Sequence, residues 1–188
     1  PLKIRKGDFN NDSNLDLFVV NEGNEVTVLP GNGSGAFLTP IVKPTGSGSL
    51  PYDIAVGDID GDGNDDFVVS LSGTNKVSIF KSSGTDFVST PRNTGSSPYG
   101  VAFADLNGDA RPEIIVANNG SDNIMVFSNN GTGLFGMFPT TYTSSDTKPI
   151  SITTGDFNGD GETDVAITHL VSLNSTGNVV FYVGDGTG

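Results

Sequence analysis

Short apolar runs alternate with polar stretches along the whole chain, and the order of these runs repeats four times. Each repeat opens with a proline and a brief apolar run, then has an acidic loop, a run rich in Val, Ile and Phe, and a run of alternating polarity. Runs of β-branched and aromatic residues bounded by turn residues predict strands. No segment has a sustained 3.6-residue apolar period, so the pattern predicts no helix.

The spacing of the runs predicts four blades of a β-propeller within a single domain, residues 1–188. Four short strands joined by tight turns in about 50 residues form an antiparallel blade. A single blade cannot bury both of its faces, so neighbouring blades must stack. A glycine hairpin follows the third run and ends in Phe37, Phe87 or Phe135 in the first three copies. The predicted blades are residues 1–50, 51–97, 98–148 and 149–188, with the fourth incomplete.

An acidic loop lies between the first and second predicted strands of each blade. Its first, third, fifth and ninth residues carry side-chain oxygens, and its sixth residue is small, which permits a tight turn. The seventh residue varies, which suits a position that offers a ligand through its backbone carbonyl. The residues at positions 1, 3, 5, 7 and 9 are Asp8, Asn10, Asp12, Asn14 and Asp16; Asp58, Asp60, Asp62, Asn64 and Asp66; Asp105, Asn107, Asp109, Arg111 and Glu113; and Asp156, Asn158, Asp160, Glu162 and Asp164.

Oxygen donors in this number predict about four Ca²⁺ sites, one in each loop, because Ca²⁺ takes roughly six to eight oxygen ligands. Zinc or copper would require His or Cys, and the chain has one His and no Cys. The loops differ from EF-hand loops, which close with a Glu at position 12 between two helices. The alternative interpretation is four ordinary Asx turns without metal. Four copies in register favour calcium, and the third loop, with Ala110 and Pro112, departs furthest from the pattern.

The charge of the chain is strongly negative, −13, with 22 acidic and 9 basic residues. More than half of the acidic residues lie in the four loops, so most of the negative charge belongs to the predicted metal ligands. A nucleic-acid ligand would require a basic face, and an anionic membrane would repel this chain. No segment approaches the roughly 18 apolar residues of a membrane span. Weak calcium modules work at extracellular calcium concentrations, so we expect a secreted or cell-surface protein.

These features resemble the FG-GAP/VCBS repeat family, the calcium-loop propellers found in integrin α-subunit heads and in many secreted bacterial and fungal proteins. The resemblance rests on the four acidic loops, the Gly-x-Gly-x-x-Phe hairpin at 31–37 and the Pro-Tyr pairs at 51 and 98. It implies a propeller with structural calcium. Family propellers of this kind usually have seven blades, so we expect part of a larger propeller. A closed ring of four blades is the alternative.

Function is less constrained by the sequence than fold, because this family serves in adhesion modules, lectins and enzyme-linked domains. We expect a non-enzymatic module that binds a glycan or a protein. The alternatives are a propeller domain of a hydrolase or lyase and a structural subunit that self-associates through open blade edges. No nucleophile–base pair is visible in the sequence. Candidate ligand-binding residues are His169, beside a long turn, and Tyr52 and Tyr99, which precede innermost strands.

Overall fold

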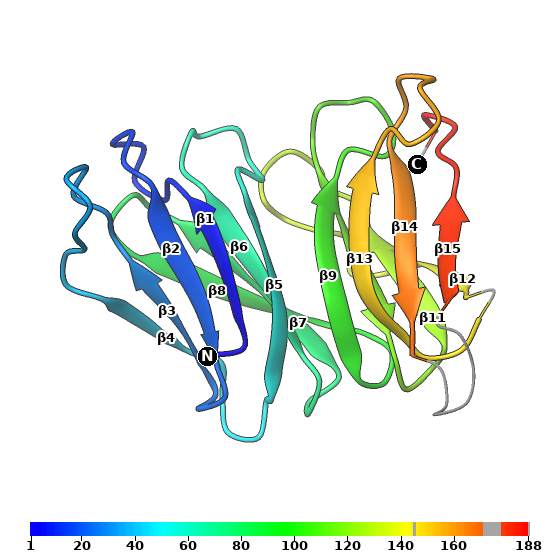
Figure 1. Ribbon diagram of the computed structural model, residues 1–188, viewed down its shortest axis with the longest axis horizontal. Helices are drawn as coiled ribbons and strands as arrows, with labels where there is room; N and C mark the ends of the chain where they lie inside the picture. The colour runs from blue at the N-terminus through cyan, green and yellow to red at the C-terminus, as the bar shows by residue number, and fades with distance from the viewer. Residues whose placement is uncertain (145, 171–177, 188) are drawn as a thin grey trace.

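The computed structural model describes residues 1–144, 146–170 and 178–187, and all regular elements in these ranges are β-strands. The strands form four antiparallel sheets, each built from strands that are consecutive in the sequence (Figure 1). The prediction of an all-β propeller is therefore confirmed. Within the described ranges, no helix is long and apolar enough to cross a membrane.

Among the described residues, three blades have four strands and the fourth has three. Blade 1 contains β1 (Lys3–Gly7), β2 (Asp16–Asn21), β3 (Glu25–Leu29) and β4 (Ile41–Pro44). Blade 2 contains β5 (Pro51–Gly57), β6 (Asp66–Leu71), β7 (Lys76–Ser82) and β8 (Phe87–Asn93). Blade 3 contains β9 (Pro98–Ala104), β10 (Glu113–Asn118), β11 (Asn123–Phe127) and β12 (Thr140–Thr143). Blade 4 contains β13 (Pro149–Gly155), β14 (Asp164–His169) and β15 (Asn178–Tyr182).

The acidic loop connects the first and second strands of every blade in the same register. The ninth residue of the loop pairs with the small residue that precedes the first Asp. These pairs are Gly7↔Asp16, Gly57↔Asp66, Ala104↔Glu113 and Gly155↔Asp164. The four loops consequently have the same place in their blades, as the repeat predicts.

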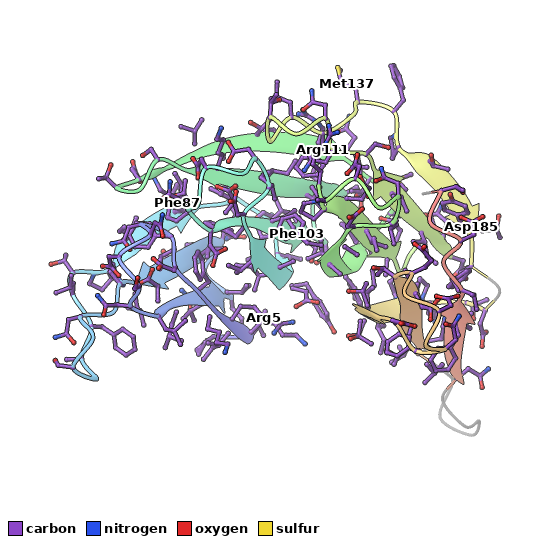
Figure 2. All side chains as sticks on the ribbon, turned by 90° about the horizontal axis from the view of Figure 1, so that it is seen from above. Arg5, Phe87, Phe103, Arg111, Met137 and Asp185 are labelled. Carbon is purple, nitrogen blue, oxygen red and sulfur yellow. The ribbon has the colours of Figure 1, made fainter. Side chains whose placement is uncertain are left out.

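The blades follow one another along an arc, with the first strand of each blade on the concave side (Figure 2). Strand β1 contacts β5, β5 contacts β9, and β9 contacts β13. Within the described part of the chain, no contact of comparable extent joins β13 to β1. The alternative of a closed four-bladed ring is therefore not seen.

The core is divided into three apolar clusters, one between each pair of successive blades. The cluster between blades 1 and 2 is aromatic: the ring of Phe67 lies 4.4 Å from that of Phe80, 5.0 Å from Phe87 and 5.6 Å from Phe18, measured between centroids. Aliphatic side chains dominate the other two clusters. Burial of these side chains is the main stabilising contribution to the stack of blades.

Candidate functional site

The four acidic loops share a network of hydrogen bonds to backbone amides. The carboxylate at position 1 accepts a hydrogen bond from the amide at position 6, at 2.8–2.9 Å in every loop. The carboxylate at position 5 accepts one from the amide at position 7, also at 2.8–2.9 Å. The residue at position 6 has a positive φ in all four loops, including Ser13 at 68° and Ala110 at 63°. This conformation is costly for residues other than glycine, so small residues there have a structural reason.

The carboxylate at position 9 is buried and ties the loop to the third strand. One of its oxygens accepts a hydrogen bond from the backbone amide of position 2, with N···O distances of 2.9–3.1 Å. The other oxygen accepts a hydrogen bond from a backbone amide at or just after the end of the third strand. The donors are Gly31, Ser82, Asn129 and Gly184. Each such residue therefore links three segments of its blade before any metal is considered.

Burial makes the ionised form of this carboxylate costly. It raises the pKa of Asp66 to about 7, against the lowering effect of the hydrogen bonds from Ser82 and Ile59. The charges of Asp60 and Asp62 raise it further. Burial likewise raises the pKa of Asp16 and of Glu113. A dication close to these groups would favour their ionised forms.

Two observations test whether the loops fit a cation. In the second loop, carboxylate oxygens of Asp58, Asp60 and Asp66 all lie within 4.8 Å of one another. In the first loop, the side-chain oxygen of Asn10 is buried and has no hydrogen-bond partner. Buried polar atoms are almost always paired, so an unpaired oxygen in such a loop fits a metal ligand. The donors are all hard oxygens, the set that Ca²⁺ prefers.

Two of the loops also contact a basic side chain. Lys81 forms an ion pair with Asp60 in the second loop. In the third loop, Nε of Arg111 lies 3.6 Å from a carboxylate oxygen of Asp109. The first and fourth loops have no ion pair with a basic side chain among the described residues. Their carboxylates therefore have no competing ion pair in the part of the chain that the structure describes.

Side chains of the hairpin link each of the first two blade interfaces, a feature that the sequence analysis missed. The Ser82 hydroxyl donates to the carbonyl of Phe9 at 2.7 Å, and the Asn129 amide donates to the carbonyl of Ile59 at 2.8 Å. In both cases the carbonyl belongs to position 2 of the preceding blade's loop. Gly184 occupies the equivalent place in blade 4 and has no side chain to donate.

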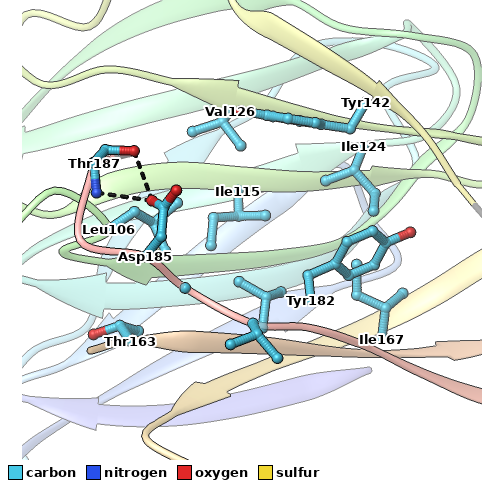
Figure 3. Close-up of a pocket in the computed structure, with 13 residues that line it drawn as sticks. Leu106, Ile115, Ile124, Val126, Tyr142, Thr163, Ile167, Tyr182, Asp185 and Thr187 are labelled. Atoms are coloured by element: carbon cyan, nitrogen blue, oxygen red, sulfur yellow. Dashed lines mark hydrogen bonds between the residues drawn. The ribbon is translucent and has the colours of Figure 1, made fainter. Parts of the chain in front are cut away.

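A cavity of about 260 Å³ lies at the third interface, between blades 3 and 4 (Figure 3). At the first interface the corresponding space is filled by Phe87, whose ring lies 5.5 Å from that of Phe9. At the second, Phe135 packs in one cluster with Ile59. Leu106, the counterpart of Phe9 and Ile59, lines the cavity. Other apolar side chains that line it are Ile115, Ile124, Val126, Val165 and Ile167.

Aromatic and polar groups surround the apolar floor of this cavity. Tyr142, on β12, has the register position that Lys43 has on β4 and Arg92 on β8. Those two cations bond to the next blade's hairpin, at Asp86 and at the carbonyl of Phe135. Tyr142 instead lines the cavity, as does Tyr182 of β15. The cavity therefore has a tyrosine on each side, one from each blade (Figure 3).

The rim of the cavity includes the exposed carboxylate of Asp185. One of its oxygens accepts hydrogen bonds from the hydroxyl of Thr187 at 2.6 Å and from the amide of Thr187 at 3.0 Å (Figure 3). These bonds lower the pKa of Asp185, so it is ionised at neutral pH. The second oxygen has no hydrogen bond among the described residues and is available as an acceptor. An apolar cavity with a few fixed polar groups is the usual form of a small-molecule site.

The three ligand-binding candidates from the sequence lie elsewhere. His169 is buried: its Nδ1 lies 3.0 Å from the carbonyl oxygen of Thr147 and its Nε2 3.3 Å from the hydroxyl of Ser144. Most of the long turn after it lies outside the described residues. Tyr52 and Tyr99 stack on each other with ring centroids 4.2 Å apart and planes 10° apart. Each tyrosine therefore has one ring face covered by the other.

Comparison with known proteins identifies the repeat. A family model for the FG-GAP-like repeat matches residues 8–69, 62–116 and 105–167, which together cover most of the chain. The chain belongs to the FG-GAP-like repeat family. Each match begins in or next to an acidic loop and extends to the second strand of the following blade, so the loops and strands described above are the family's repeat. No curated protein sequence matches the chain significantly.

Solved structures are similar to this FG-GAP-like chain at low sequence identity. One is a lectin of Agrocybe aegerita that recognises non-reducing terminal N-acetylglucosamine, with a TM-score of 0.57 and 18% identity over 97% of this chain. The chain spans about half of that lectin, 52% of its length. Another is BBS1N, solved in complex with ARL6DN, with a TM-score of 0.48 and 12% identity over 98% of this chain and 69% of that one.

Proposed function

We propose that this FG-GAP-like propeller is a calcium-stabilised, non-catalytic binding module of a secreted or cell-surface protein, with a carbohydrate as ligand. The observations that support the proposal are the FG-GAP-like repeats and the fold shared with a lectin, and the cavity between blades 3 and 4, with its two tyrosines and Asp185, is the first candidate site to test. The other two interfaces are filled with side chains.

Structural calcium in the acidic loops is the first part of the proposal. The carboxylates at positions 1, 5 and 9 and the side-chain oxygen at position 3 would hold the ion. A bound ion would supply positive charge to a loop in which several carboxylates lie close together. The protein's own hydrogen bonds already hold the loop in shape, which lowers the entropy cost of binding. Extracellular calcium concentrations suit weak sites of this kind.

Carbohydrate binding is the second part. Sugars present apolar ring faces and a periphery of hydroxyl groups, so their sites combine aromatic rings with hydrogen-bond acceptors. Tyr142 and Tyr182 offer aromatic faces, and Asp185 offers a charged acceptor for hydroxyl groups. The volume of about 260 Å³ is slightly below the roughly 300–1,000 Å³ of most ligand pockets, which suits a single terminal sugar. The shared fold with a lectin makes N-acetylglucosamine the first sugar to test.

A protein ligand is the second candidate, and the repeat itself favours it. The place of the cavity is occupied by a phenylalanine at both other interfaces, Phe87 in one and Phe135 in the other, and the same position of the fourth hairpin follows Gly188. An aromatic side chain of a partner polypeptide would fill the same apolar cavity. The peptide of residues 83–93, which contains Phe87 and β8, is the natural probe for this alternative.

The experiment is a glycan array in millimolar calcium, followed by calorimetric titration of any glycan that binds. We expect binding to a panel that includes N-acetylglucosamine-terminated glycans, and loss of binding in Tyr142→Ala and in Asp185→Asn. Tyr52→Ala is the matched control, because it removes a tyrosine from a different interface. Binding should survive in this variant.

The outcomes separate the candidates. If Tyr52→Ala abolishes glycan binding while Tyr142→Ala retains it, the ligand binds at the tyrosine stack and the cavity assignment is wrong. If no glycan binds but the 83–93 peptide does, and its Phe87→Ala form does not, the ligand is a protein. If neither binds, the binding function itself is refuted.

A further inference from the structure

The second acidic loop differs from the other three in the side chain at its third position. That residue is Asp60, whereas the other loops have an asparagine there, Asn10, Asn107 or Asn158. At positions 1, 3, 5 and 9 the second loop therefore carries four carboxylates, and each of the other loops carries three. The additional negative charge lies among carboxylates that are already close together, so it raises the repulsion within the loop.

An asparagine at the third position has a donor that an aspartate lacks. In the fourth loop, Nδ2 of Asn158 donates a hydrogen bond to the carboxylate of Asp160 at 2.9 Å, and the first loop has the same bond at 3.0 Å. Asp60 keeps only the acceptor role of this position, because one of its oxygens accepts a hydrogen bond from the amide of Asp62 at 3.3 Å. Its other oxygen needs a positively charged or donating partner from elsewhere.

A lysine provides that partner. Lys81, in β7, forms an ion pair with the second oxygen of Asp60. The strand registers place Lys81 one residue after the last paired residue of the third strand, and the equivalent residues of the other blades are uncharged. These residues are Pro30, Ser128 and Val183. The additional carboxylate and the additional lysine therefore occur together, in the same blade.

This ion pair is more enclosed than an ordinary surface pair. The side chain of Asp60 is only 6% exposed, while that of Lys81 is 42% exposed. Gly133, in the hairpin of blade 3, lies against both residues. A Cβ atom on Gly133 would be 3.4 Å from Cδ of Lys81 and 3.5 Å from Cβ of Asp60. Because the hairpin covers the carboxylate, water screens the pair less than it screens exposed pairs.

We propose that Lys81 competes with calcium for Asp60 and thereby sets the calcium affinity of the second loop. Lys81 compensates the charge of Asp60 when no ion is bound. An ion that uses Asp60 as a ligand has to share the carboxylate with the ammonium group, and the two positive charges repel each other. The affinity is consequently lower than four carboxylates alone would give, since ligand charge tunes calcium affinity. This inference rests on the proposed calcium binding and names a residue that tunes one site.

A calcium titration of glycine-labelled protein, followed by NMR, observes individual loops. Gly63 and Gly161 have position 6 in the second and fourth loops, and each amide donates to the carboxylate at position 1 at 2.9 Å. Calcium binding in a loop should therefore shift the amide resonance of its own glycine. We expect Lys81→Met to lower the calcium concentration at half-saturation of Gly63 roughly tenfold and to leave that of Gly161 unchanged. Lys76→Met, at the other end of β7, is the matched control and should change neither.

A second background tests whether the lysine acts through Asp60. Asp60→Asn gives the second loop the asparagine of the other loops and removes the partner of Lys81. In this background, Lys81→Met should change the half-saturation of Gly63 by less than about twofold, because the two substitutions remove the same interaction. A tenfold effect of Lys81→Met with Asp60 and without it would refute competition for this carboxylate.

Thermal unfolding gives an independent measurement. Lys81→Met should lower the melting temperature in EDTA, because the nearly buried carboxylate of Asp60 loses its partner. The difference should disappear in saturating calcium, since the variant gains more stability from the ion. Lys81→Gln keeps a polar side chain at this position and should behave in the same way, so it replaces the methionine variant if that variant does not fold.

The outcomes separate this inference from calcium binding itself. If Gly161 responds to calcium while neither substitution of Lys81 changes the response of Gly63, the role of Lys81 is wrong and calcium binding stands. If neither glycine of the original chain responds to calcium, calcium binding and the role of Lys81 are both refuted.

Discussion

The interface between blades 1 and 2 and the interface between blades 3 and 4 are built from the same repeat but packed differently. In the first, Phe87 fills the space beside Phe9, and the Ser82 hydroxyl bonds to the Phe9 carbonyl. Between blades 3 and 4 the hairpin position that corresponds to Phe87 follows Gly188, and a cavity of about 260 Å³ lies among the described residues. The repeat therefore fixes the positions of the strands, and the aromatic residue at the end of the hairpin fills the space between two blades.

Both interfaces lie between blades with acidic loops, and we expect the largest effect from removing the calcium that we propose these loops bind. With free calcium at about ten times the dissociation constant, each site adds about 1.4 kcal/mol, so four sites add about 5–6 kcal/mol. For a chain of this size such a loss lowers the melting temperature by roughly 10–20 °C. Thermal unfolding in calcium and in EDTA measures it, with magnesium as the control ion. An identical melt in EDTA would contradict structural calcium.

Two neighbouring residues of β10 allow the packing of two blade interfaces to be compared. Ile114 and Ile115 are both almost fully buried, with exposed fractions of 0% and 1%. Ile114 packs toward blade 2 and Ile115 lines the cavity toward blade 4. Truncation of a buried isoleucine to alanine costs about 2–5 kcal/mol, depending on how much packing is lost. We expect Ile114→Ala near the upper value and Ile115→Ala near the lower one.

Denaturant unfolding of the two variants gives these values. Phe138→Ala, at an exposed position, should lie within about 0.5 kcal/mol of the original chain. Equal losses for Ile114→Ala and Ile115→Ala would mean that the third interface is as well packed as the others.

The hydrogen bond of the closed interface gives a smaller expected effect. Ser82→Ala leaves the buried carbonyl of Phe9 without its donor, which costs about 1–3 kcal/mol. Ser89→Ala, an exposed serine on β8 in the same blade, is the control and should be neutral. Calorimetry of both variants measures the difference. A neutral Ser82→Ala would show that the link between blades 1 and 2 is not needed.

The repeat made the fold predictable from the sequence, since the acidic loops and the glycine hairpins mark the strand boundaries directly. The shared register and the small residues at position 6 follow from those marks. The cavity does not, because Tyr142 and Tyr182 reach it from two different blades. These positions are far apart in the sequence and meet only when the blades stack. His169 attracted attention as the single histidine, yet its ring is enclosed by Ser144 and Thr147.

The most direct test of the proposed function is a methyl NMR titration of isoleucine-labelled protein with an N-acetylglucosamine-terminated glycan in calcium. Ile115, Ile124 and Ile167 line the cavity, whereas Ile54 and Ile59 lie in the filled interfaces and serve as internal controls. We predict shifts of the first three methyl resonances that saturate with added glycan, and none for the two controls. Shifts at Ile54 or Ile59 alone, or no shifts with any glycan of the panel, would contradict carbohydrate binding between blades 3 and 4.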